Sequence, residues 1–147
     1  MQSALILARQ AQRLREVPIG AIVVYNNQII GRGFNRRESE CVSLRHAEMI
    51  AIEEACQTLG SWRLLNCELI VTLEPCIMCA GAIYQSRIRR VVFGAVDPKA
   101  GAVGSLYEIH NDSRLNHRFV VKPGVLADEC SALLRNFFSA RRAEKQN

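Results

Sequence analysis

The sequence has no apolar run that approaches the roughly 20 residues of a membrane-spanning helix. Its N-terminus has no basic segment followed by an apolar core and a small-residue cleavage site, which is the pattern of a secretory signal. It also has no internal repeat, no linker and no low-complexity segment. These absences argue against membrane-spanning, secreted, repetitive and disordered proteins, so we expect a cytoplasmic protein with no membrane partner.

The composition is typical of a compact globular domain. Of the 147 residues, 49% are hydrophobic and 22% are charged, and a chain of this length can bury a core without disulfide bonds. We therefore expect residues 1–147 to form a single domain. Lys and Arg outnumber Asp and Glu by 19 to 14, which gives a formal charge of +5. This positive charge is compatible with nucleic-acid binding but does not require it.

Hydrophobic periodicity predicts that strands and helices alternate along the chain. The expected elements, in order, are a helix at 3–15 with Leu5, Ala8, Ala11 and Leu14 buried, a hairpin of strands at 19–25 and 29–34, a loop at 35–45, a helix at 46–59, a strand at 67–73, a helix from Pro75 toward Arg87, a strand at 90–95, a loop at 96–105, a strand at 117–121 and a helix at 126–142. This alternation predicts an α/β sandwich with much of its sheet parallel and covered by helices.

Two cysteines lie three positions apart in the segment TLEPCIMCAG, residues 72–81. On a helix, Cys76 and Cys79 would share one face, so two thiolates could bind one ion. A helix N-terminus, which Pro75 favours, also lowers the pKa of a thiol. Disulfide bonds are not expected, since cytoplasmic thiols stay reduced. Taken alone, the C-x-x-C spacing is compatible with a zinc ligand pair, a redox-active dithiol or coincidence.

The segment HAE, residues 46–48, supplies a partner for the cysteine pair. In the first turn of a helix, side chains lean toward the N-terminus, so His46 and Glu48 could both reach a site beyond it. One His and two Cys would leave the fourth tetrahedral position of zinc open, which is typical of catalytic sites. Glu48 is not needed as a ligand, and proton transfer is its natural role. The alternative for Glu48 is a solvated carboxylate stabilised by the helix dipole.

A closed, purely structural metal site is the alternative to an open one. It would need a fourth protein ligand, for which the remaining cysteines are the candidates. Two of them fall on predicted helical core stripes and a third begins a buried strand, so we expect none to close the site. The four cysteines are Cys41, Cys56, Cys67 and Cys130.

The chain resembles the bacterial TadA-type tRNA adenosine deaminases of the cytidine/deoxycytidylate deaminase superfamily. The H-x-E and P-C-x-x-C motifs of zinc nucleobase deaminases appear here as HAE and PCIMC. The zinc motif is typical of the whole superfamily, while the flanking segments favour the tRNA branch. These segments are EVPIGA, GRGFN, HAEMIAI, WRL, VTLEPCIMCAGAI, RVVFGA, GSLY, LNHR, LADEC and FF before a basic tail.

The resemblance implies a fold, a metal and a reaction. The fold would be a three-layer α/β/α sandwich of the cytidine-deaminase type with a mixed five-stranded sheet, and the protein would be a homodimer. One Zn²⁺ per subunit would be bound by His46, Cys76 and Cys79. Glu48 would transfer protons while water replaces the amino group at C6 of a flipped-out adenine. The substrate would be the wobble adenosine in the anticodon stem-loop of an arginine tRNA, which becomes inosine.

The resemblance also implies four RNA contacts. Asn35 matches a residue that contacts the target nucleoside, and Ala47 one whose backbone faces the base. Asp97 matches a residue near the adjacent RNA backbone, although it could instead stabilise the turn at DPKAG. Phe138 matches a residue near the anticodon loop, but the sequence does not separate it from the adjacent Phe137.

Two features depart from the family pattern, and three other functions compete. Leu44 and Arg45 replace smaller residues before His46, so the pocket rim and the flanking-sequence preference are expected to differ. Relatives usually carry several more residues before their first helix, so Met1 is expected to lie inside that helix, as the result of a truncated or a misassigned start. The competing functions are deamination of a free base or nucleoside, zinc-stabilised RNA binding without catalysis, and dithiol redox chemistry at Cys76 and Cys79.

Overall fold

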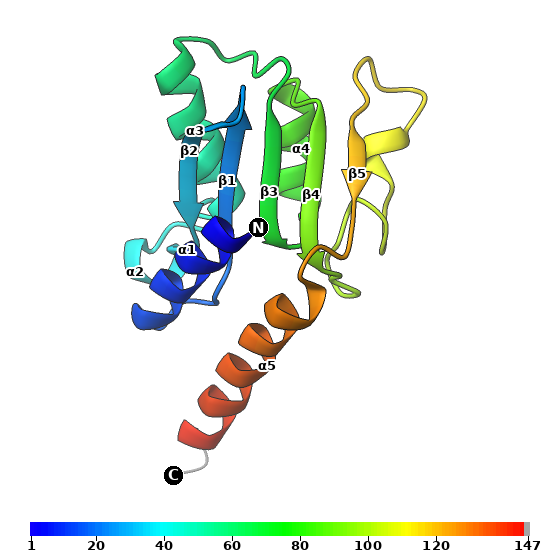
Figure 1. Ribbon diagram of the computed structural model, residues 1–147. Helices are drawn as coiled ribbons and strands as arrows, with labels where there is room; N and C mark the ends of the chain where they lie inside the picture. The colour runs from blue at the N-terminus through cyan, green and yellow to red at the C-terminus, as the bar shows by residue number, and fades with distance from the viewer. Residues whose placement is uncertain (146–147) are drawn as a thin grey trace.

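The computed structural model describes residues 1–145, which form a five-stranded sheet with helices on both faces (Figure 1). No helix in this part of the chain combines the length and apolarity needed to cross a membrane. The elements in chain order are α1 (Gln2–Arg13), β1 (Gly20–Tyr25), β2 (Gln28–Phe34), α2 (Arg37–Glu40), α3 (Ala47–Leu59), β3 (Glu68–Leu73), α4 (Ile77–Gln85), β4 (Arg90–Ala95), the 3₁₀ helix η1 (Ile109–Asn111), β5 (Val120–Lys122) and α5 (Ala127–Glu144).

The strand order is β2-β1-β3-β4-β5. Strand β1 pairs antiparallel with both β2 and β3, whereas β3–β4 and β4–β5 are parallel pairs. The mixed five-stranded sheet implied by the family resemblance is therefore confirmed. Two of the four strand pairs are parallel, in line with the expectation that much of the sheet is parallel, and the β1–β2 hairpin, which inserts β1 between β2 and β3, makes the other two antiparallel.

The sheet is the middle of three layers. Helices α3 and α4 cover one face, where their buried side chains join those of β1, β3 and β4 in the main hydrophobic core. Helix α1 and the first turns of α5 lie on the other face, and Leu5 and Cys130 belong to a smaller core there. Figure 1 shows that the rest of α5 extends past the edge of the sheet. The three-layer α/β/α arrangement is thus confirmed.

The hairpin turn brings the start of β1 and the end of β2 to the same end of the sheet, opposite the turn itself. Asn26 and Asn27 both have positive φ, 48° and 61°, which is the conformation of a tight two-residue hairpin turn. Strands β3 and β4 terminate at this end as well, since β3 is antiparallel to β1. The predicted functional residues near 35, 46, 76 and 97 follow these strand ends and are therefore brought together.

Two glycines on β2 allow α3 to lie directly on the sheet. A Cβ atom on Gly31 would lie 2.1 Å from the carbonyl oxygen of Ala51, and one on Gly33 would lie 2.1 Å from that of Ala47. These distances leave no room for any side chain. The start of α3, and with it His46, is held in place by this contact.

Several predicted boundaries differ from the observed ones. Helix α1 ends at Arg13, so Leu14 lies past the helix and is exposed rather than buried. The predicted loop at 35–45 contains the single-turn helix α2, which is too short to show an apolar periodicity and ends at Cys41 in a left-handed conformation. Strand β5 is shorter than predicted and η1 was not predicted at all, because short surface elements carry little hydrophobic pattern.

We expect Gly33→Ala to lower the free energy of unfolding by about 1–3 kcal/mol, because the added methyl group pushes α3 away from β2. Gly81→Ala is the matched control, since Gly81 lies in α4 and a Cβ there meets nothing within 4 Å. This control should be neutral or slightly stabilising. Urea denaturation measures both, and equal midpoints for the two variants would contradict the close-contact account.

Candidate metal centre and substrate cleft

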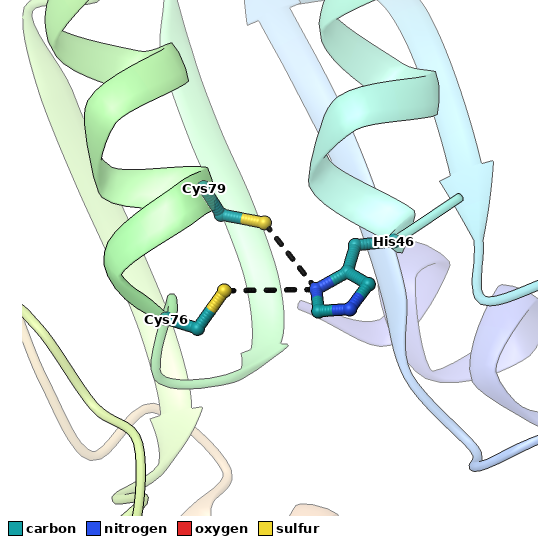
Figure 2. Close-up of side chains that lie close together, drawn as sticks. All are labelled: His46, Cys76 and Cys79. Carbon is teal, nitrogen blue, oxygen red and sulfur yellow. Dashed lines mark hydrogen bonds between the residues drawn. The ribbon is translucent and has the colours of Figure 1, made fainter. Parts of the chain in front are cut away.

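The metal centre lies where the N-terminal ends of α3 and α4 lie side by side (Figure 2). His46 is the residue that caps α3, and Cys76 caps α4 in the same extended conformation. His46 Nδ1 is 3.7 Å from Cys76 Sγ and 3.6 Å from Cys79 Sγ. Cys76 precedes the first helical residue, so the prediction that both cysteines lie within the helix is wrong. The two thiols still point toward the same nitrogen.

The surroundings of the cluster favour a negatively charged thiolate, which is the form that binds a cation. A hydrogen bond from the Cys79 thiol, helped by His46, lowers the pKa of Cys76 to about 4 although burial opposes this. The hydrogen bond to Cys76 raises the pKa of Cys79, and burial raises it further. The pKa of His46 is also raised, chiefly by its hydrogen bond with Cys76. The Cys76 thiolate therefore forms readily.

The donor set fits zinc. One imidazole nitrogen and two cysteine sulfurs, all within 4.8 Å of one another, match the soft, tetrahedral coordination that Zn²⁺ prefers. Within residues 1–145, no other group of His, Cys, Asp or Glu has this arrangement. The other four cysteines do not join the cluster. Three protein ligands leave one tetrahedral position for a reacting molecule.

Glu48 is buried beside the three ligands. Only 4% of its surface is exposed, so the alternative of a solvated helix-start carboxylate is wrong. Burial raises the pKa of Glu48 to about 7, and its own backbone N–H and the charge of His46 only partly offset this. The carboxylate also interacts with the Cys79 thiol. A carboxyl group with a pKa near neutrality can both accept and return a proton.

A cleft of about 930 Å³ opens next to this centre, at the end of the sheet where β2, β3 and β4 terminate. His46 contributes to its floor, and α5 forms one wall. The cleft contains more cations than anions, which suits a polyanionic ligand. Its lining residues include Val17, Asn35, Arg37, His46, Asp97, Lys99, Arg135, Phe138 and Arg142.

Of the four predicted RNA contacts, three line the cleft. They are Asn35, Asp97 and Phe138. Phe137 is 8% exposed and packs edge-on against Phe138, which is 44% exposed. The structure thus separates the two phenylalanines, with Phe137 in the protein interior and Phe138 at the cleft. Ala47 is fully buried as the first residue of α3.

Asp97 also has a structural role. Its carboxylate accepts hydrogen bonds from the backbone N–H groups of Lys99, at 3.0 Å, and Ala100, at 3.2 Å. The alternative that Asp97 stabilises the turn at DPKAG is therefore supported, and this role is compatible with its place on the cleft wall.

The two residues that depart from the family pattern lie outside this lining. Arg45 forms ion pairs with Glu40 and Glu53, both at 2.9 Å, so its charge is locally neutralised. Leu44 is exposed. With Val42 and Met49, both residues line a separate shallow pocket on the outer side of α3.

The loop after β4 is organised by Glu74, which sequence reasoning missed. This buried carboxylate accepts hydrogen bonds from the backbone N–H groups of Asp97, Val103 and Ser105 and from the Ser105 hydroxyl. Burial would raise the pKa of Glu74, but these hydrogen bonds hold it below its usual value. A Cβ on Gly101 would lie 2.3 Å from the carboxylate. A charged residue between a buried strand and Pro75 is the signal that could have identified it.

The family comparison agrees with this geometry. Residues 1–95 match the model of the "Cytidine and deoxycytidylate deaminase zinc-binding region". This segment contains all three candidate ligands and Glu48, and it ends with β4. The class of protein is therefore a zinc-binding deaminase, an enzyme class that acts by hydrolysis.

Individual relatives narrow the class. The chain is 49% identical to a tRNA-specific adenosine deaminase of Bacillus subtilis, over 99% of this chain and 91% of the relative. It is 48% identical to one of Haemophilus influenzae, over 99% of this chain and 85% of the relative. A solved structure from a study of A-to-I editing by tRNA:A34 deaminases has a TM-score of 0.88 and 42% identity, covering 91% of this chain and 97% of that one. The chain belongs to the tRNA-specific adenosine deaminases.

We expect Glu74→Gln to lower the free energy of unfolding by about 2 kcal/mol, because the amide leaves buried N–H donors without an acceptor. The melting temperature should fall by roughly 4–8 °C for a domain of this size. Glu68→Gln is the control at the other end of β3, since it removes only a partly exposed ion pair with Arg90. Calorimetry that finds no difference between the two variants would contradict the role given to Glu74.

Proposed function

We propose that this enzyme deaminates the wobble adenosine in the anticodon stem-loop of an arginine tRNA to inosine. The observation that carries the proposal is the buried Glu48 beside a three-ligand metal centre, whose His46 lines a basic cleft. Relatives that are 47–49% identical over almost the whole chain are named tRNA-specific adenosine deaminases. The solved structure with TM-score 0.88 comes from a study of editing at the wobble position of transfer RNA.

The chemistry is divided between the metal and Glu48. Zinc held by His46, Cys76 and Cys79 would lower the pKa of water toward neutrality and so supply a nucleophile. Glu48 would accept the first proton that the water loses and pass it to N1 of adenine, and would then carry the second water proton from the new C6 hydroxyl to the amino group, which departs as ammonia. The net reaction consumes one water and releases one ammonia. The buried position of Glu48 beside the three candidate ligands suits this exchange, because a carboxyl group there is within reach of a reacting molecule and shielded from solvent.

The cleft wall suits an RNA loop. Arg37, Lys99, Arg135 and Arg142 surround the opening, and cations at such a rim attract phosphate groups. Phe138 presents an exposed aromatic ring on which a base can stack. We assign the remaining contacts by the family resemblance: Asn35 to the target nucleoside, Ala47 through its backbone to the base, and Asp97 to the neighbouring RNA backbone.

The proposal extends to assembly and location. We infer one zinc ion per subunit, a single domain over residues 1–147, a cytoplasmic enzyme and a homodimer. Large hydrophobic side chains left more than half exposed support a protein partner, and they include Ile77, Leu106 and Tyr107.

Light scattering of the purified protein should give twice the mass of one chain, and a monomer at micromolar concentration would contradict the dimer.

Deamination of a free base is the competing function. A guanine deaminase from Nitrosomonas europaea has a TM-score of 0.76 and 28% identity, covering 92% of this chain and 81% of that one. The zinc centre alone does not separate the two functions, because both would use the same ligands. The basic cleft rim favours RNA, because a neutral base has no phosphate for the cations to bind.

We expect Glu48→Gln to lower the rate of inosine formation by about 10²–10⁴-fold, because the amide cannot move a proton. Zinc-loaded protein is incubated with total bacterial tRNA, and inosine is detected by sequencing as adenosine read as guanosine. Glu53→Gln is the control, since Glu53 is an exposed residue on the same helix. Both variants should retain one zinc per chain.

The pattern of inosine distinguishes the alternatives. Inosine at one arginine anticodon with the wild-type protein and the Glu53→Gln control, but not with Glu48→Gln, supports the proposal. Ammonia release from free guanine or adenosine without inosine in tRNA would favour the competing function. Equal inosine formation by all three proteins would overturn the role of Glu48.

A further inference from the structure

A glutamate is buried where α1 ends, outside the metal centre. The helix closes with hydrogen bonds from the N–H of Arg15 to the carbonyl of Gln12, at 2.9 Å, and from the N–H of Glu16 to that of Ala11, at 3.0 Å. Arg15 has a positive φ of 62°. This is a Schellman ending, in which the position of Glu16 is usually occupied by a hydrophobic residue. Glu16 is nevertheless completely buried, so its carboxylate needs partners.

The partners of Glu16 lie on the segment that borders the cleft. Glu16 Oε1 accepts hydrogen bonds from the backbone N–H of Ser39, at 2.7 Å, and from its hydroxyl, at 2.8 Å. Glu16 Oε2 accepts one from Asn35 Nδ2, at 3.2 Å. None of the ion pairs within residues 1–145 includes Glu16. Neutral donors that follow β2, rather than a cation, therefore hold this carboxylate.

These contacts fix which way the Asn35 amide points. Asn35 Nδ2 faces Glu16 Oε2 and also the carbonyl oxygen of Val17, at 3.4 Å. The Val17 carbonyl can only accept a hydrogen bond, so the amide nitrogen must face it and the amide oxygen must face away. Asn35 Oδ1 is buried and has no hydrogen-bond partner in the protein. Because Asn35 lines the cleft, a ligand in the cleft is the natural partner of this oxygen.

We propose that Glu16 is a positioning residue, which holds the Asn35 amide so that Oδ1 is presented to the target nucleotide as a hydrogen-bond acceptor. The inference rests on the proposed function, since it assumes that a nucleotide enters the cleft. Nδ2 already lies within hydrogen-bond distance of Glu16 and Val17, so Asn35 offers the nucleotide an acceptor. The nucleotide group that meets it must then be a donor, a hydroxyl or an N–H.

A double-mutant cycle tests whether Glu16 acts through Asn35. The readout is kcat/KM on an anticodon stem-loop RNA that the wild-type protein converts to inosine. We expect Glu16→Gln and Asn35→Ala each to lower kcat/KM about tenfold, the loss of roughly one hydrogen bond. In the Asn35→Ala background, Glu16→Gln should then lower it by less than about twofold. Zinc content and melting temperature are measured for every variant.

The control is Glu54→Gln. Glu54 also accepts a hydrogen bond from a backbone N–H, that of Arg32, at 3.0 Å, but it lies away from the cleft. It should leave kcat/KM unchanged. A purely structural role for Glu16 predicts instead that the two losses multiply to roughly a hundredfold, and that outcome would overturn the proposal.

If Glu16→Gln alone folds poorly, a second pair of variants, in which the donor and the acceptor of this hydrogen bond are exchanged, tests the proposal. In Asn35→Asp two carboxylates would face each other, whereas combining it with Glu16→Gln restores a donor opposite an acceptor. The combined variant should be at least about fivefold more active than Asn35→Asp alone. Equal activity of the two would contradict the proposal. Absence of inosine with the wild-type protein would instead count against the proposed function.

Discussion

The contact between α3 and β2 determines where the metal centre can form. Gly31 and Gly33 let the helix backbone lie on the strand without any intervening side chain. His46 directly precedes this helix, so its imidazole is placed by the contact and not by interactions of its own. The cysteines come from the start of α4, which follows β3 in the same sheet. Two rigid helix starts are thereby held close enough for three side chains to share one ion.

Three buried glutamates around the cleft have different roles because their partners differ. Glu48 lies among ligands and apolar residues, and its raised pKa suits proton transfer. Glu74 receives several N–H groups and stays ionised, which fixes the loop that carries Asp97. Glu16 receives hydrogen bonds from Asn35 and Ser39 and orients a side chain at the cleft. The basic rim above them is left to attract the ligand.

Much of the fold followed from hydrophobic periodicity, which placed the long helices and central strands to within a few residues. The candidate ligands His46, Cys76 and Cys79 and the candidate proton carrier Glu48 could be predicted because HAE and PCIMC match the motifs of the zinc nucleobase deaminases. The insertion of β1 between β2 and β3 was not predicted, since strand order depends on contacts between distant residues. Glu16 and Glu74 were missed for the same reason: their partners lie 19 to 31 residues away in sequence. Phe137 and Phe138 could be separated only when the orientation of α5 was known.

The central claim is a zinc centre with three protein ligands and one position free for a reacting molecule. X-ray absorption at the zinc edge, on protein loaded with one equivalent of zinc, tests this most directly. The account predicts two sulfurs at about 2.3 Å and two light atoms at about 2.0–2.1 Å, one from His46 and one from water. Adding a purine-like inhibitor should change only the light-atom shell. Three or four sulfurs, or a spectrum that no inhibitor alters, would show a closed structural site and contradict the account.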